Sequence, residues 1–374
     1  MSLILLKKTD KKKGIIVFTH KELDFFKGNY NLNFFPIKIS KILTFFFKPI
    51  FKLYCSYIIS KIKKDYIIGI HYGWYFKNIQ VPEWVDFIMA LDQTFKTTNS
   101  KIIIPFASTN FLPSHFIKKR EITSFDIIMV SRDVNFKGVM KFLKVIKMYF
   151  NKYGNCKVLI ICPEATNQYG KKKSFNLIQK IYSEFSDNER SHIFYIRLSA
   201  ATGYLGTNRE FVSMMMRKSH TLCLFSELEG VAKVINEGQL SGCNIVSYNK
   251  LEGGGRKFID RNYDFSYSSL TSCCNSLFKS LKKKNRNFSE RKKIYKKLSQ
   301  EYNYQKFIIN LGKYFDVPTI NSKRWFKGDL SRFLPSHQWS RKHTPWISVK
   351  NAMKYSTDIN NFSKLKNFYK CLDF

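Results

Sequence analysis

Two glutamates, Glu229 and Glu237, lie eight residues apart in a stretch of sequence that has the pattern of a ligand-binding unit. Within residues 221–248, two apolar runs predict strands, the residues between them have helical spacing, and Gly242 occupies a position where a helix end favours a positive φ. Parallel strands joined by a helix form a Rossmann-like unit, which binds ligands beyond the carboxyl ends of its strands. We therefore expect Glu229 at that end of a parallel sheet, with Glu237 further along the helix.

The two carboxylates suit the recognition of sugar hydroxyls, because a carboxylate accepts hydrogen bonds from vicinal diols. With Glu229 at the N-terminal tip of the helix predicted over residues 231–240, Glu237 lies about 12 Å further along the axis. This separation suits a sugar and a ribose. Free backbone N–H groups around Gly230, at the N-terminus of the helix, favour an anion between them. The alternative is that both glutamates are solvated on an exposed helix face.

A second group of residues suits a diphosphate. Residues 126–131 predict a strand and residues 139–153 a long helix, and the turn between them carries Arg132 and Lys137. Gly138 opens the helix. Two cations at the carboxyl end of a strand, above a helix N-terminus, neutralise a diphosphate. We therefore expect this turn at the same end of the sheet as Glu229.

Several glycines are candidates for close contact between the backbone and a ligand. Gly253 and Gly254 follow the predicted strand 244–248, where bare backbone either approaches a phosphate or forms a flexible turn. Gly206 belongs to a predicted loop that is a candidate to border a nucleotide base.

Histidines stand at the ends of two predicted strands in the N-terminal part of the chain. His71 ends the strand 66–71, and His20 follows the strand 14–19. Both positions face the ligand side of an α/β domain. Because a lone histidine is more often structural than catalytic, both interpretations stay open.

The composition sets limits on the class of protein. The chain has 374 residues, which suits two domains, and 44% hydrophobic residues provide enough apolar surface for their cores. The eight cysteines include no CxxC pair and no zinc-type spacing, which favours a reducing, cytoplasmic setting. We expect neither a secretory signal nor a membrane-spanning helix, because apolar runs of about 18 residues do not occur.

The net charge of +37, from 64 Lys and Arg against 27 Asp and Glu, has two interpretations. It favours an anionic partner, either nucleic acid or a membrane surface, or it reflects a general bias toward Lys, Ile, Asn, Phe and Tyr. The absence of zinc-finger and RNP-like motifs argues against specific recognition of nucleic acid. The basic, aromatic segment 37–64 suits a membrane interface, or a core helix with snorkelling lysines.

Over residues 120–275, these motifs resemble the donor-binding domain of the retaining GT-B glycosyltransferases of family 4. Members show a strand that ends in Arg, a Lys five residues later, and then Gly. They later show a Ser-x-x-Glu-Gly turn, a second Glu eight residues after the first, and a Gly before a strand. The residues that match are Arg132, Lys137, Gly138, Ser226, Glu229, Gly230, Glu237 and Gly242.

The resemblance implies an α/β fold of the GT-B type, with two Rossmann-like domains facing a central cleft. We expect an acceptor-side domain over residues 1–118 and a nucleotide-sugar donor-binding domain over 119–300. A basic, aromatic C-terminal extension over 301–374 then packs back on the N-terminal domain. The region after Thr19 lacks the family's Gly-rich loop, which leaves acceptor recognition and a catalytic role for His71 open.

The resemblance also implies roles for residues. Arg132 and Lys137 stabilise the donor diphosphate in place of a metal cofactor. Glu229 faces the hydroxyls of the donor sugar and Glu237 the ribose, while the glycines at 253–255 lie near the phosphates.

The implied enzyme transfers a sugar from a nucleotide-sugar donor to a glycan or lipid-linked acceptor with retention of configuration. We expect it to serve cell-surface polysaccharide synthesis, in the cytoplasm or peripherally on the inner face of the cell membrane. The first alternative is a non-catalytic basic protein on a degenerate GT-B scaffold, bound to nucleic acid or an anionic membrane. The second is an epimerase or phosphorylase related to the GT-B enzymes.

Overall fold

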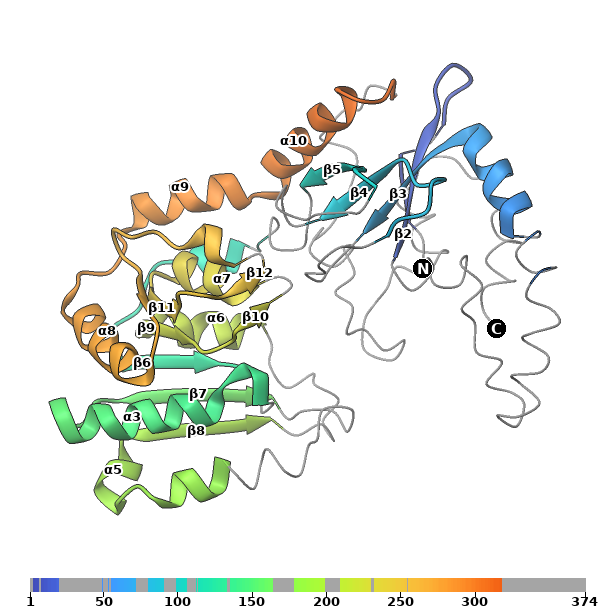
Figure 1. The fold of residues 1–374 in the computed structure, drawn as a ribbon. Helices are drawn as coiled ribbons and strands as arrows, with labels where there is room; N and C mark the ends of the chain where they lie inside the picture. Colours follow the sequence, from blue (N-terminus) through green and yellow to red (C-terminus); the bar gives the residue numbers. More distant parts are fainter. Residues whose placement is uncertain are drawn as a thin grey trace. The chain divides into compact units, whose positions relative to one another are not determined.

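A computed structural model of the chain describes residues 3–6, 8–19, 49, 53, 55–71, 80–90, 99–105, 112, 114–132, 135–163, 178–198, 209–229, 232–253 and 255–317 (Figure 1). These residues divide into two units. The first takes in the described residues up to Pro105 and those from Glu301 onward, and the second those from Leu112 to Gln300. Each unit has its own mainly parallel sheet.

The first unit contains a five-stranded sheet whose spatial order is the sequence order: β1 (Leu3–Leu6), β2 (Gly14–Thr19), β3 (Tyr66–His71), β4 (Phe87–Ala90) and β5 (Ile102–Pro105). β1 pairs antiparallel with β2, and the other pairs are parallel. β3 and β4 are buried throughout, as expected for strands covered on both faces.

Two helices complete the described part of the first unit. A helix over residues 55–65 places Cys55, Ile59 and Ile62 in the core of this sheet. Helix α10 (Gln300–Gly312) belongs to the same unit. After it, the ring of Phe315 lies 5.8 Å from that of Phe87, between centroids.

The second unit contains a six-stranded, entirely parallel sheet in the order β13-β11-β9-β6-β7-β8. Its strands are β6 (Phe125–Val130), β7 (Val158–Pro163), β8 (Ile193–Leu198), β9 (Ser219–Leu224), β11 (Asn244–Tyr248) and β13 (Phe265–Tyr267). Renumbered along the chain, this is the order 3-2-1-4-5-6 of dinucleotide-binding Rossmann sheets. A short pair, β10 (Leu228–Glu229) with β12 (Glu252–Gly253), stands apart from it.

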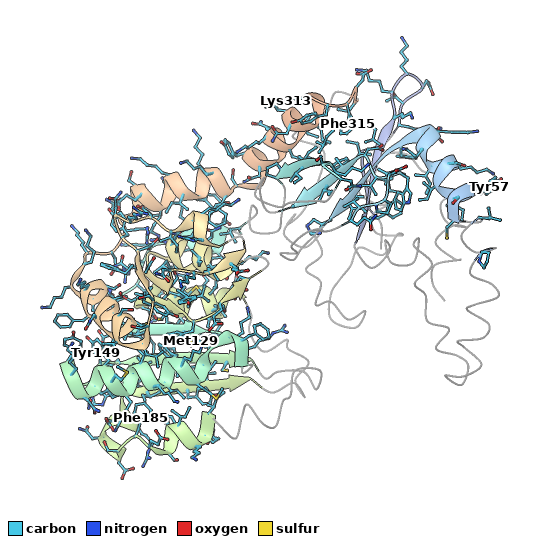
Figure 2. The ribbon with its side chains drawn as sticks, viewed as in Figure 1. Tyr57, Met129, Tyr149, Phe185, Lys313 and Phe315 are labelled. Atoms are coloured by element: carbon cyan, nitrogen blue, oxygen red, sulfur yellow. The ribbon has the colours of Figure 1, made fainter. Side chains whose placement is uncertain are left out.

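Helices cover both faces of the second sheet. α3 (Val139–Tyr153) and α8 (Leu270–Lys282) pack on one face, while α6 (Arg209–Arg217), α7 (Lys233–Ser241) and α9 (Phe288–Leu298) pack on the other. Met129 of β6, Tyr149 of α3 and Phe185 share the first of these two cores (Figure 2). The apolar stripe of α3 recurs at intervals of three and four residues, so one face of the helix is buried.

α5 (Asp187–Ser191) begins with a capping box. The Ser186 hydroxyl accepts from the N–H of Glu189, whose carboxylate accepts from the N–H of Ser186. The ammonium of Lys147 on α3 lies 2.6 Å from the same carboxylate. The hydrogen bond from Lys147, with those from Ser186, holds the pKa of Glu189 below its ordinary value.

Two arginines fix the C-terminal end of α7. Gly242 ends this helix with φ of 94°, as the left-handed position after a helix requires. Arg120 donates to the carbonyl oxygen of Gly242 at 3.1 Å, and the buried Arg291 donates to that of Leu240. Cations at the last carbonyls of a helix also oppose its dipole. The orientation of α7 in the unit is therefore set at this end.

A buried ion pair fixes the start of β13 against β11. Asp264 and Arg286 pair at 2.7 Å with both side chains 0% exposed. The carboxylate of Asp264 also accepts from the N–H of Ile245, the second residue of β11, at 2.9 Å. Burial raises the pKa of Asp264 and the Arg286 guanidinium opposes that rise.

The predicted α/β class is confirmed, and so are the strands predicted at 14–19, 66–71 and 244–248. One local expectation is wrong. Glu229 lies in the short strand β10 and not at the tip of a helix, because α7 begins only at Lys233.

The basic, aromatic segment 37–64 lies partly outside the described residues, which include only positions 49, 53 and 55–64 of it. Its described helix buries Cys55 and Ile59 and exposes Leu53 and Tyr57. Contact with a membrane stays a prediction. Within the described ranges, none of the helices combines the length and the apolar character that crossing a lipid bilayer requires.

Candidate active site

The candidate site lies at the carboxyl ends of β6 and β9. These two strands are neighbours in the sheet, although β7 and β8 come between them in the sequence. The connections leaving them run in opposite directions along the sheet, and this switch point is where Rossmann sheets bind ligands. The loop after β6 leads to Lys137, and the loop after β9 leads to Glu229.

An ion pair joins the two loops across 92 residues of sequence: the Lys137 ammonium donates to Glu229 Oε1. The side chains are 16% and 10% exposed, so both charges are largely removed from water. Removing either partner therefore leaves a poorly solvated charge. Glu229 also lies opposite Gly253 in the parallel pair β10–β12, which brings this glycine to the site.

Gly138 holds the first loop against β9. Its φ is 71°, in the left-handed region, where it caps the N-terminus of α3. A Cβ at this position would lie 2.6 Å from the Cβ of Phe225 and 3.1 Å from its carbonyl oxygen. Only glycine satisfies both the dihedral and the contact. This close approach places the adjacent Lys137 within reach of Glu229.

The N-terminus of α3 is suited to an anion. Gly138 supplies no side-chain cap, and the first turn contains no acid. Lys141 lies in this turn, where its charge adds to the positive end of the helix dipole, and it pairs with Glu227. The backbone N–H groups of this turn, beside two lysines, provide hydrogen-bond donors that suit a phosphate.

Two serine hydroxyls at the strand ends are buried without a partner. Ser131 directly follows β6 and is 8% exposed; Ser226 closely follows β9 and is 0% exposed. Among the described residues, neither Oγ has a hydrogen-bond partner. An unsatisfied buried hydroxyl is costly, which favours a ligand group at this point. Neither serine was predicted to contact a ligand, although the sequence shows both as polar residues that follow apolar runs.

The structure brings together part of the predicted site. Lys137, Glu229 and Gly253 lie together, and the half-buried Arg132 lies two residues after the end of β6. Glu237 lies half-buried on α7. The expected helical rise of about 12 Å between the two glutamates is wrong, because only the residues from Lys233 onward are helical.

The remaining predicted residues belong to the first unit or lie outside the described residues. His71 ends β3 in the first unit, where it is 2% exposed and pairs through its backbone with Met89. Four predicted positions lie outside the described residues: His20, Gly206, Gly230 and Gly254. Over the described ranges, no group of three or more His, Cys, Asp and Glu side chains converges as a metal site.

No protein family model matches the sequence, and no curated protein matches it either. Several solved structures are similar to the chain. TarM is 11% identical, with a TM-score of 0.49 over 68% of this chain and 51% of its own. The α,α-trehalose 6-phosphate synthase from Burkholderia multivorans is 12% identical, with a TM-score of 0.46 over 70% of this chain and 66% of its own.

The pneumococcal O-GlcNAc transferase GtfA, solved in complex with UDP and GlcNAc, is 13% identical, with a TM-score of 0.41 over 70% of this chain and 52% of its own. The chain thus spans about half the length of the TarM and GtfA chains.

Proposed function

We propose that the protein is a retaining GT-B glycosyltransferase that moves a sugar from a nucleotide-sugar donor to a glycan or lipid-linked acceptor. The observation that carries the proposal is the Lys137–Glu229 ion pair at the switch point of a Rossmann-ordered sheet. In this partly buried pair, the ammonium of Lys137 can bind a phosphate and the carboxylate of Glu229 can accept hydrogen bonds from sugar hydroxyls.

The diphosphate of the donor binds at the N-terminus of α3. The free N–H groups of the first turn and the ammonium of Lys137 face it, and Arg132 adds a second cation at the end of β6. The hydroxyls of Ser131 and Ser226 donate to the phosphate oxygens, which supplies the partners that they lack among the described residues.

The chemistry follows from this arrangement. When the bond between the anomeric carbon and the diphosphate oxygen breaks, its electron pair stays on that oxygen. Lys137 and Arg132 stabilise the resulting negative charge, which is greater in the transition state than in the bound donor. The acceptor hydroxyl forms the new bond, and its proton leaves with the diphosphate.

Glu229 accepts hydrogen bonds from the hydroxyls of the donor sugar. One of its carboxylate oxygens accepts a hydrogen bond from Lys137. Donor binding shifts this ammonium toward the phosphate and leaves the carboxylate to accept from two neighbouring hydroxyls. Glu237 accepts hydrogen bonds from the ribose hydroxyls, while the backbone at Gly253 and Gly254 approaches the phosphates.

The acceptor side belongs to the N-terminal domain, residues 1–118, with His71 as a candidate catalytic group at the end of β3. A net charge of +37 supports an acceptor held at an anionic membrane surface. If so, neutralising the lysines between residues 38 and 64 should release the protein from anionic vesicles. Binding that persists would show that this segment does not hold the protein at the membrane.

Isothermal titration of the full chain with UDP-, GDP- and ADP-sugars tests the donor site. We expect one nucleotide class to bind, and Lys137→Ala to weaken it by about 10–100-fold, since a hydrogen bond to a charged group is lost. Lys144→Ala removes the same charge from an exposed position on α3 and serves as the matched control. Its affinity should equal that of the wild type.

Two outcomes would contradict the proposal. If no nucleotide-sugar binds, while polyanions bind with a steep salt dependence, the protein is a basic binding protein. If Lys137→Ala and Lys144→Ala weaken donor binding equally, Lys137 contributes only through the net charge of the protein and does not contact the donor. Glu229→Gln adds a catalytic readout, since nucleotide release in the presence of acceptor should fall while the fold is retained.

A further inference from the structure

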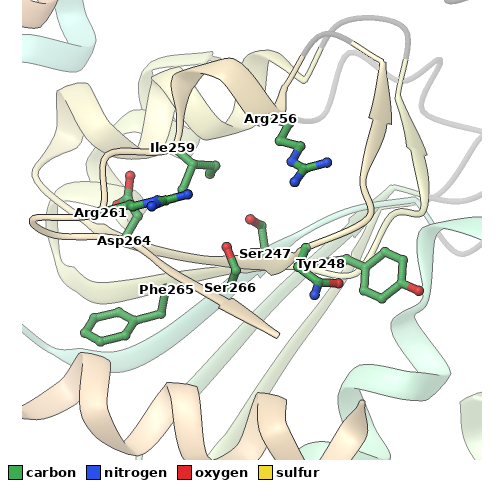
Figure 3. A pocket seen from close by; sticks show the side chains of 9 residues that line it. Ser247, Tyr248, Arg256, Ile259, Arg261, Asp264, Phe265 and Ser266 are labelled. Carbon is green, nitrogen blue, oxygen red and sulfur yellow. The ribbon is translucent and has the colours of Figure 1, made fainter. Parts of the chain in front are cut away.

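A pocket of about 490 Å³ lies in the second unit beside the edge strand β13 (Figure 3). Two segments form its walls: the adjoining strands β11 and β13, and the loop that connects β12 to β13. The lining includes Ser247 and Asn249 from the end of β11, and Arg256 and Arg261 from the loop. It includes none of the residues of the proposed donor site. Its volume falls in the range of about 300–1,000 Å³ that small-ligand sites occupy.

Arg256 and Arg261 bring positive charge to the lining of the pocket. Among the described residues, neither Arg256 nor Arg261 has an ion pair or a hydrogen bond from its guanidinium. The acid in the lining, Asp264, is fully engaged, because its oxygens accept from Arg286, from Gln239 and from two backbone N–H groups. A guanidinium presents paired donors that match a phosphate.

The pocket also contains an acceptor that needs a donor. Asn249 Oδ1 is buried and has no hydrogen-bond partner within the described part of the chain. Ser247, which is 1% exposed, places a hydroxyl-bearing side chain in the same wall. Phosphate oxygens only accept hydrogen bonds, so they satisfy the arginines and not this amide oxygen. A ligand that satisfies both carries a phosphate and a hydroxyl group.

We propose that this pocket binds a phosphorylated polyol of the size of a sugar phosphate. Its phosphate binds Arg256 and Arg261, and one of its hydroxyls donates to Asn249 Oδ1. The site is separate from the proposed donor site, although the loop that lines it follows β12, which pairs with β10 beside Glu229.

Titration of the full chain with glucose 6-phosphate tests the proposal. Two charge-assisted contacts are lost in R256A/R261A, so we expect an affinity at least 10-fold lower. The control variant K250A/K257A removes the same charge from neighbouring positions that do not line the pocket. It should bind as the wild type does. Equal losses in the two variants, or no binding to the wild type at millimolar concentration, would overturn the proposal.

Asn249→Ala distinguishes the contact made by the ligand's hydroxyl from the contact made by its phosphate. It should weaken glucose 6-phosphate by about 3–10-fold, the loss of one hydrogen bond, and leave inorganic phosphate unchanged. Loss of both to the same extent would overturn the assignment of Asn249 to a hydroxyl. Lys137→Ala should retain glucose 6-phosphate binding while nucleotide-sugar binding falls, so failure of this site and failure of the donor site are distinguishable.

Discussion

Replacing Gly138 by alanine tests how the chain assembles the proposed donor site. The added Cβ would lie 2.6 Å from the Cβ of Phe225. Carbon atoms pack at about 3.5–4.0 Å, so the turn has to move away from β9 by about 1 Å. Lys137 is the preceding residue and moves with the turn, away from Glu229.

The expected magnitude has two parts. Holding an L-residue at a φ of 71° costs about 1–2 kcal/mol, and overpacking costs about 1–3 kcal/mol more. We therefore expect Gly138→Ala to lower the free energy of unfolding by about 2–5 kcal/mol. A displacement of about 1 Å at a reacting group also lowers the rate of transfer by about 100-fold.

Gly154→Ala, at the other end of α3, is the matched control. Gly154 has φ of 88°, but no atom lies within 4 Å of the position that an added Cβ would take. Its substitution therefore adds backbone strain of about 1–3 kcal/mol without a clash. Urea denaturation measures the free energy of unfolding, and titration with the donor measures the site. Unchanged donor binding and transfer in Gly138→Ala would refute the argument, whatever the loss of stability.

Three further predictions follow from buried charges. Arg286→Leu leaves Asp264 buried and unpaired, and should lower the free energy of unfolding by about 3–5 kcal/mol in urea denaturation; a smaller loss than about 1 kcal/mol would contradict this. The pKa of Glu189 is lowered in the folded chain, so its stabilisation is present above the pKa of the unfolded chain and disappears as the pH falls through the folded pKa. Unfolding free energies of Glu189→Gln and the wild type should therefore converge in acid, and a constant difference would exclude the effect. A double-mutant cycle on Lys137→Met and Glu229→Gln should give a coupling of about 1–3 kcal/mol, whereas additive effects would show that the pair contributes nothing to stability.

Much of the local structure follows from the sequence because it depends on near neighbours. The apolar run at 244–248 predicts β11, and Gly242 before it predicts a left-handed helix end; both are present. The prediction that Glu229 lies at the N-terminal tip of the helix is wrong for a non-local reason. Glu229 pairs with Gly253 in a two-stranded ladder, an interaction between residues far apart in the sequence.

The sequence also identifies the residues of the proposed donor site by type. Arg132 and Lys137 follow one apolar strand and Glu229 follows another, a pattern that predicts cations and a carboxylate at strand ends. It does not reveal that Ser131 and Ser226 are buried without partners among the described residues. Their burial depends on the packing of both loops, which Gly138 and its contact with Phe225 decide.

Hydrophobic periodicity and glycine dihedrals act over a few residues, so strands, helix ends and the kind of chemistry that the site residues offer can be predicted from the sequence. Which of these residues lie together depends on the fold. The order of strands places β6 beside β9, and this brings Lys137 to Glu229 across 92 residues. Strand order arises from packing between distant segments, so it cannot be predicted from the spacing of residues along the chain.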